Sequence, residues 1–186
     1  MGAISSTLPT FSNETIMSSP FGASVSPEEY QRRLNSVRRA LRQNDLAGLL
    51  VYDDVRCGLH ISYFCGLDIA DDASVQVLLL LDASGNPVLF VPEEYVERAM
   101  KVAAFEICDM KYLEARLHIF TMTHRDGKVG MAGMKYAPSD LLERVKCGLG
   151  CAGVSQFRSY MLMRLFLFWQ RHVYGRNELG LPQCEG

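Results

Sequence analysis

Residues able to act as acids, nucleophiles or metal ligands are concentrated between positions 53 and 67. This segment reads DDVRCGLHISYFCGL and lies between two apolar runs, residues 48–52 and 75–81. Its reactive side chains are carboxylates, an imidazole, a phenol and thiols: Asp53, Asp54, Cys57, His60, Tyr63 and Cys65. Carboxylates and imidazoles exchange protons and bind metal ions, and thiolates act as nucleophiles. Any chemistry of the chain is therefore expected in or around this segment.

The carboxylates Asp53 and Asp54 directly follow an apolar run that is typical of a buried strand. Carboxylates at the C-terminal end of such a strand can hold Mg²⁺, and Asp68, Asp71 and Asp72 follow nearby. A metal-dependent enzyme built on the Asp53/Asp54 cluster is therefore one hypothesis. The alternative is that this pair begins a turn and that the later aspartates lie on an exposed loop. Since no basic groove accompanies the pair, a nuclease is disfavoured.

The other polar side chains of the segment have both a structural and a functional interpretation. Histidine is suited to proton transfer near neutral pH, but the sequence shows no acid partner or nucleophile beside His60. It also shows no base that would activate Cys57 or Cys65, so buried structural thiols are expected. Phe64 suits a core anchor. For Tyr63 a core role and a functional role both remain open, because its hydroxyl needs a polar partner in either position.

The composition is that of an ordinary single globular domain. The chain has 186 residues, 48% of them hydrophobic, and its formal net charge is −2, so no basic excess predicts nucleic-acid binding. Its 6 cysteines show no CxxC pair and no zinc-ligand spacing, which favours free thiols in a reducing, cytoplasmic compartment. The apolar stretch at residues 160–169 contains Arg164 and is far shorter than the ~20 residues that span a bilayer, so no membrane segment is expected.

Regular structure is predicted to begin at Ser26. Residues 1–25 are rich in Ser, Thr, Pro and Gly and are expected to form a flexible N-terminal arm. Ser26, Pro27 and Glu29 are typical of a helix N-terminus, and Asn44 is typical of a helix end. The helix has an apolar stripe at Tyr30, Leu34, Val37 and Leu41. The opposite face is expected to be solvated and carries arginines: Arg32, Arg33, Arg39 and Arg42.

The rest of the chain alternates strand and helix patterns. Residues 47–52 read as a strand that is covered on both faces. Two further strands, 75–81 and 87–91, are expected to pair antiparallel across a short loop. Later strands are expected at 105–110 and 128–133, and helices from Pro92, at 112–120 and at 138–146 with an end at Gly148.

Taken in order, these pieces resemble the N-terminal domain of the creatinase, prolidase and aminopeptidase P family. The resemblance covers residues 26 to 148 and rests on SPEEYQRRLNSVRRAL, DLAGLLVY, HISYFCGL, VQVLLLLDASGNPVLFVPEEYVERA and KVGMAGMKYAPSDLLERV. Family members show a run similar to Asn-Ile-Arg-Tyr-Leu-Thr-Gly-Phe. This chain matches it at Ile61, Tyr63 and Gly66 and departs from it at His60, Phe64 and Cys65.

The resemblance implies an α/β fold with three α/β/α layers, a ribonuclease-H-like mixed sheet flanked by helices. It implies a domain at residues 26–153, followed by a divergent apolar tail at 154–186. In the family, hydrolysis takes place in a C-terminal domain whose two Asp, one His and two Glu bind two divalent metals. Residues resembling that domain do not follow here, so no catalytic residue, cofactor or metal is expected in this chain.

The function implied is therefore a non-catalytic one. As a homodimer, or bound to a catalytic subunit, the chain would form the rim of its partner's substrate pocket through Tyr63, Phe64, His60 and Asp68. Two alternatives stay open, namely the metal-dependent enzyme described above and a truncated product without independent activity.

Overall fold

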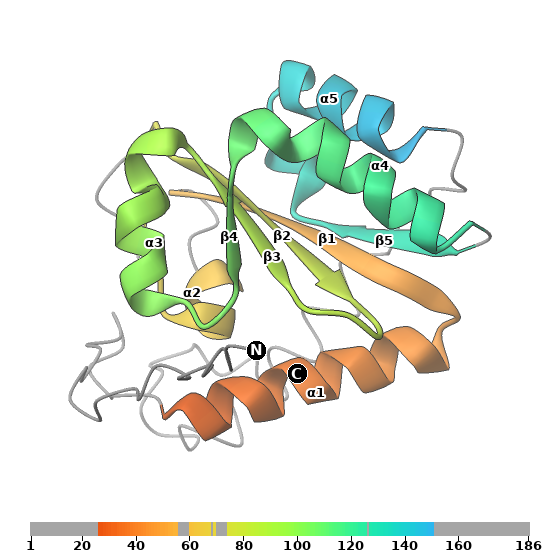
Figure 1. Cartoon of the computed structure of the whole chain (residues 1–186), viewed down its shortest axis with the longest axis horizontal. Helices are drawn as coiled ribbons and strands as arrows, with labels where there is room; N and C mark the ends of the chain where they lie inside the picture. The colour runs from red at the N-terminus through yellow and green to blue at the C-terminus, as the bar shows by residue number, and fades with distance from the viewer. Residues whose placement is uncertain (1–25, 56–59, 68, 70–73, 126, 151–186) are drawn as a thin grey trace, which may run out of the picture.

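A computed structural model describes residues 26–55, 60–67, 69, 74–125 and 127–150. Its centre is a 5-stranded mixed sheet in the order β4-β3-β2-β1-β5 (Figure 1). Neighbouring strands pair antiparallel in β1–β2 and β2–β3 and parallel in β1–β5 and β3–β4. The antiparallel pair predicted around the loop after residue 81 is thus confirmed. The strands are β1 (Leu46–Asp54), β2 (Gln76–Asp82), β3 (Val88–Val91), β4 (Glu106–Asp109) and β5 (Lys128–Ala132).

Helices cover both faces of this sheet, as the α/β/α prediction requires (Figure 1). One face packs against α1 (Pro27–Gln43), α2 (His60–Cys65) and α3 (Val96–Val102). The other face packs against α4 (Leu113–Thr123) and α5 (Ser139–Leu149). Short 3₁₀ turns at Glu93–Tyr95, Met110–Tyr112 and Met134–Tyr136 precede α3, α4 and α5.

Strand β1 lies inside the sheet and joins the two cores. Successive side chains of a strand point to opposite faces. Accordingly, Leu49 and Val51 pack in the core under α1, whereas Leu50 and Tyr52 pack in the core under α4 and α5. Because both faces are covered, the strand has no polar alternation, and the prediction of a doubly buried strand is confirmed.

Helix α1 begins as its sequence predicts, but one of its arginines is buried. The Ser26 side chain accepts a hydrogen bond from the Glu29 amide at 3.4 Å. The stripe residues Leu34, Val37 and Leu41 are buried. Arg33, which was expected on the solvated face, is only 4% exposed. It lies at the border of the stripe, where neighbouring elements determine whether water reaches it.

Several predicted boundaries were wrong by one to a few residues. Asn44 ends α1 as its C-cap, as expected, but the left-handed conformation typical of a helix end is adopted by the next residue, Asp45, with φ 54°. The β1 strand continues through Asp53 and Asp54 where a turn was expected. Helix α5 passes Gly148 and ends at Leu149, with Gly150 as its C-cap. Gly148 instead packs closely on α4, where a Cβ would lie 2.8 Å from the Leu117 Cβ.

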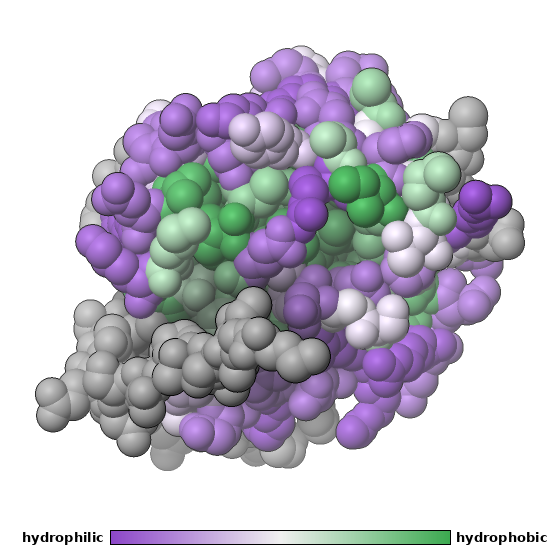
Figure 2. Space-filling view, in the orientation of Figure 1, coloured by the Kyte–Doolittle hydropathy of each residue, from purple (hydrophilic) through white to green (hydrophobic). Residues whose placement is uncertain are grey.

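Apolar side chains are exposed on two helices beside the edge strand β4. Met100 on α3 is 62% exposed, whereas its neighbour Ala99 is buried. Ile119 on α4 is 55% exposed. Figure 2 shows hydrophobic residues gathered over the part of this face where α3, β4 and α4 lie. Strand β4 ends the sheet, so one of its edges has no strand partner in the described part of the chain.

Within the described ranges, no helix is long and apolar enough to cross a membrane. The predicted N-terminal arm, residues 1–25, and the predicted apolar tail, residues 154–186, lie outside the described residues.

Candidate functional site

The candidate site lies where β1 ends and α2 begins. Asp53 is fully buried, and its Oδ2 accepts a hydrogen bond of 2.8 Å from the backbone amide of Ile61, in the first turn of α2. Its other oxygen, Oδ1, lies 3.6 Å from Nδ1 of His60. A carboxylate beside the first amides of a helix satisfies donors that have no partner within the helix. Asp53 therefore fixes the start of α2 on the end of β1.

Asp54 points to the opposite face of the sheet from Asp53. It is 3% exposed, and its Oδ2 accepts a 2.9 Å hydrogen bond from the Tyr52 hydroxyl, which belongs to the core under α4 and α5. Adjacent residues of a strand diverge in this way. The two side chains therefore do not chelate one ion together, which counts against the metal hypothesis as the sequence posed it. Across the described residues, no group of three or more His, Cys, Asp and Glu is placed to hold a metal.

The far end of α2 is held by Arg33 of α1. Nη1 of Arg33 donates a hydrogen bond of 2.6 Å to the backbone carbonyl of Tyr63. Nε of Arg33 donates one of 3.0 Å to the Oε1 carboxylate oxygen of Glu29. The guanidinium carbon also lies 4.3 Å from the centre of the Tyr63 ring and 5.4 Å from that of Tyr30. A cation near the last carbonyls of a helix is favourable. This short helix thus has an acid at its start and a base at its end.

The predicted rim residues of α2 differ in their surroundings. Phe64 is 3% exposed and packs in the core, so its side chain does not line a surface. Tyr63 is half-buried and meets Phe64 edge to face, with ring centres 5.2 Å apart. His60 has a side chain that is 31% exposed, and Asp53 is the acid neighbour that could not be identified from the sequence. Asp68 lies outside the described residues.

The cysteine of this site is unsuited to nucleophilic attack. Cys65 is 2% exposed, its Sγ lies 3.3 Å from the Ile61 carbonyl oxygen, and burial raises the pKa of its thiol to about 12. Since the thiolate is the reactive form, Cys65 is inert near neutral pH, and its prediction as a buried thiol is confirmed. Cys147, in contrast, is exposed. Cys57, Asp71 and Asp72 lie outside the described residues.

Arg33 is the site residue that sequence reasoning missed. Its position offered one signal, because it lies three residues after Tyr30 and four before Val37, at the border of the apolar stripe. It also follows Glu29 by four residues, a spacing that brings opposite charges together on a helix. The sequence does not indicate that the Tyr63 carbonyl is a hydrogen-bond partner of Arg33, because Tyr63 lies 30 positions further along the chain.

Comparison with known proteins identifies the domain. The family model for the creatinase/prolidase N-terminal domain matches residues 33–154. No curated protein matches the sequence significantly. Among solved structures, the N-terminal domain of an X-Pro dipeptidase from Streptococcus pyogenes is 16% identical with a TM-score of 0.55, over 71% of this chain and 98% of that one. A proline dipeptidase from Streptococcus pneumoniae is 21% identical with a TM-score of 0.56, over 73% of this chain and 97% of that one.

A longer protein is similar in the same region. The X-Pro aminopeptidase of Thermotoga maritima is 11% identical with a TM-score of 0.56, and the match covers 72% of this chain but 35% of that one. At such identities these likenesses concern the fold. The family model, however, spans more than half of the sequence and includes α2 with both of its anchoring residues. The protein therefore belongs to the creatinase/prolidase N-terminal domain family.

Proposed function

We propose that this chain is a non-catalytic domain that dimerises, or joins a catalytic chain, and forms part of the rim of its partner's substrate pocket. The observation that supports the proposal is that both ends of α2 are held by hydrogen bonds with buried charged residues. Asp53 and Arg33 hold its two ends, and this leaves Tyr63 and His60 half-buried on a rigidly placed helix. A rim that positions a substrate must itself be held in place.

The contacts of the polar groups favour a supporting role over a catalytic one. Asp53 and Asp54 each accept a hydrogen bond from this chain's own residues, and they do so on opposite faces of the sheet. The Cys65 thiol stays protonated near neutral pH. The proposal therefore assigns no catalytic residue, cofactor, nucleic acid or membrane to this chain. The free cysteines Cys65, Cys108 and Cys147 fit a reducing, cytoplasmic location.

The proposed association has a candidate surface at the β4 edge. Strand β4 ends the described sheet, and α3 and α4, the helices on either side of it in Figure 1, carry the exposed apolar side chains Met100 and Ile119. Exposed apolar groups beside an open strand edge favour contact with another chain. The proteins similar to this one include dipeptidases and aminopeptidases that act at X-Pro sequences, so the partner's substrate is proposed to be an Xaa-Pro peptide.

Sedimentation velocity of the full chain tests the association. We expect a concentration-dependent dimer that Met100→Lys weakens, because a charge would be buried at the interface. Tyr136→Lys is the matched control, since Tyr136 is 43% exposed and follows β5, at the opposite edge of the sheet. A strictly monomeric chain that also fails to bind a catalytic partner, or equal weakening by both variants, would refute the proposed surface.

An activity assay tests the non-catalytic role. The purified chain, supplied with Mn²⁺ or Co²⁺, is expected not to hydrolyse an Xaa-Pro dipeptide. Hydrolysis that co-purifies with the chain and is lost in Asp53→Ala would overturn the proposal and restore the metal-dependent alternative.

A further inference from the structure

An open groove of about 600 Å³ lies between the second half of α1 and the turn that joins β2 to β3. The helix residues along it are spaced by three, four, seven and eight positions, so they share one face of α1. The sixth lining residue comes from the turn. The lining consists of three guanidinium groups, two amides and a hydroxyl: Asn35, Arg38, Arg39, Arg42, Gln43 and Ser84.

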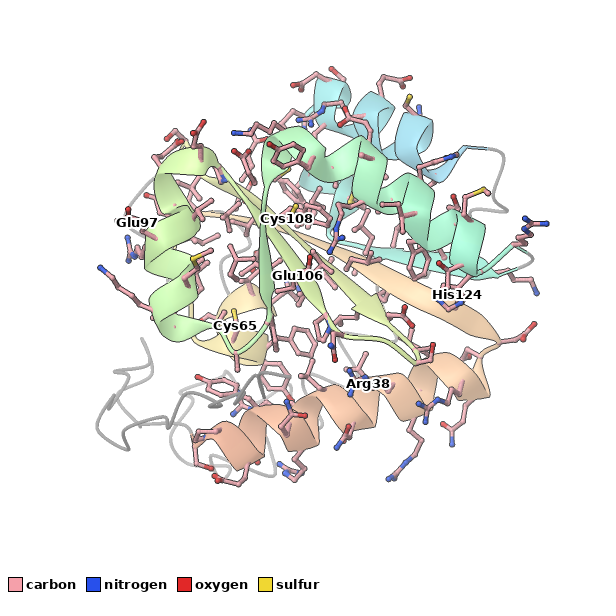
Figure 3. The ribbon with its side chains drawn as sticks, in the orientation of Figure 1. Arg38, Cys65, Glu97, Glu106, Cys108 and His124 are labelled. Atoms are coloured by element: carbon pink, nitrogen blue, oxygen red, sulfur yellow. The ribbon has the colours of Figure 1, made fainter. Side chains whose placement is uncertain are left out.

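Two of these arginines are fixed in place by the turn. Arg38 donates an Nη2 hydrogen to the Gly85 carbonyl at 2.6 Å, and Arg42 donates one to the Ala83 carbonyl at 2.7 Å. Figure 3 shows Arg38 on the side of α1 that faces the β2–β3 turn. A guanidinium carries five N–H donors, so each of these bonds orients the group and leaves further donors. Arg39, one residue along, is exposed on the same helix face.

The described lining contains no carboxylate, and the acids Asp82, Glu29 and Asp45 have other partners. Asp82 belongs to the same turn, but its Oδ1 accepts hydrogen bonds from the backbone amides of Ser84 and Gly85, at 2.7 and 2.8 Å. Its Oδ2 lies 3.1 Å from Nε2 of His124. Glu29 pairs with arginines at the start of α1. Asp45 lies 3.7 Å from the ammonium group of Lys128. The groove therefore concentrates positive charge on a chain whose formal net charge is −2.

We propose that this groove binds a small soluble anion that bears phosphate groups. Guanidinium groups match the oxygens of a phosphate through paired N–H bonds, and the side-chain amides of Asn35 and Gln43 can donate further hydrogen bonds. The Ser84 hydroxyl is not counted among these donors, because it donates to Oδ1 of Asp82 at 3.0 Å. The volume lies within the range of about 300–1,000 Å³ that is common for small-molecule sites. A nucleic acid fits less well, because the arginines that line the groove form one local cluster. The site is separate from α2, so it does not depend on the function proposed above.

Calorimetric titration of the full chain with inorganic pyrophosphate, at low salt and neutral pH, tests this site. We expect saturable binding that weakens as salt is added. Arg39→Gln should weaken it at least tenfold, because Arg39 is exposed and donates to no carbonyl of the described residues, which leaves its guanidinium for the anion. Arg98→Gln is the matched control, since it removes the same charge from an exposed position on α3. In Figure 1, α3 lies at the opposite end of the molecule from the C-terminal half of α1. The control should bind like the unaltered chain.

Three results would overturn the proposal. They are the lack of saturable pyrophosphate binding, equal weakening by Arg39→Gln and Arg98→Gln, and binding to phosphatidylglycerol vesicles that depends on Arg39 but is not displaced by pyrophosphate. The last result would assign the cluster to a lipid surface. Arg39→Lys provides a second variant, which keeps the positive charge but loses the paired N–H donors of the guanidinium. It should weaken binding less than Arg39→Gln. Circular dichroism of each variant establishes that it is folded.

Discussion

Replacing Arg33 with methionine should destabilise the domain by about 2 to 4 kcal/mol, whereas the same change at Arg32 should cost less than about 1 kcal/mol. The two arginines are adjacent, and both bond Glu29. They differ in burial, because the side chain of Arg33 is 4% exposed and that of Arg32 is 50% exposed. The pair therefore separates the effect of burial from that of charge.

The magnitude follows from the contacts of Arg33. Its 2.6 Å bond to the Tyr63 carbonyl involves a charged donor, and such bonds contribute about 1.5–3 kcal/mol. The stacking of the guanidinium on the Tyr63 ring adds about 0.5–1 kcal/mol. The pairing with Glu29 adds little, since Glu29 is partly exposed and keeps Arg32 as a partner. Methionine preserves the packing of the aliphatic stem, so the loss reports mainly on the guanidinium.

Urea denaturation of the full chain, followed by circular dichroism, measures both variants under the same conditions. The free energy of unfolding should fall markedly for Arg33→Met and remain close to that of the unaltered chain for Arg32→Met. Equal losses in the two variants, or no loss in Arg33→Met, would show that Arg33 does not anchor α2.

Three further predictions test other parts of the fold. Gly133→Ala should lower the free energy of unfolding, measured by urea denaturation, by at least about 2 kcal/mol. Gly133 has φ 73°, and a Cβ there would lie 2.3 Å from the Tyr52 carbonyl oxygen. An unchanged free energy of unfolding would contradict this close approach. With a thiol reagent at pH 8, Cys147 should react in the folded protein and Cys65 only after unfolding, because burial raises the pKa of Cys65 to about 12. Cys147→Ser should lower the number of thiols that react in the folded protein by one, whereas Cys65→Ser should leave that number unchanged. Burial tends to raise the pKa of Asp82, but the hydrogen bonds of its turn outweigh burial and lower it, so its stabilising contribution is complete above about pH 4 and is lost as pH falls through the lowered pKa. The stability difference between Asp82→Asn and the unaltered chain should therefore shrink below pH 4 in urea denaturation at a series of pH values, and a constant difference would exclude this linkage.

The helices and strands could be predicted from the sequence where interactions between residues close in the chain determine them. Ser26 caps α1 because a serine hydroxyl accepts a nearby amide in any protein context. The two strands around residues 82–87 follow from apolar runs joined by a short polar loop. Helix ends were less readable, since Gly148 looked like a terminator but is used to pack α5 closely on α4. A glycine allows both roles, and only the neighbouring helix selects one of them.

The sequence by itself determined the order of the strands and of the helices other than α2, and it determined the doubly buried β1. These properties depend on side-chain periodicity and capping, which act over a few residues. The family was indicated separately, by the resemblance of ordered motifs. Only the tertiary structure decided that Arg33 is buried, that Asp53 and Asp54 serve opposite faces, and that Asp53 is the acid beside His60. The physical reason is that the burial and partners of a charged side chain depend on which distant segments pack around it, and the spacing of residues along the chain does not specify them.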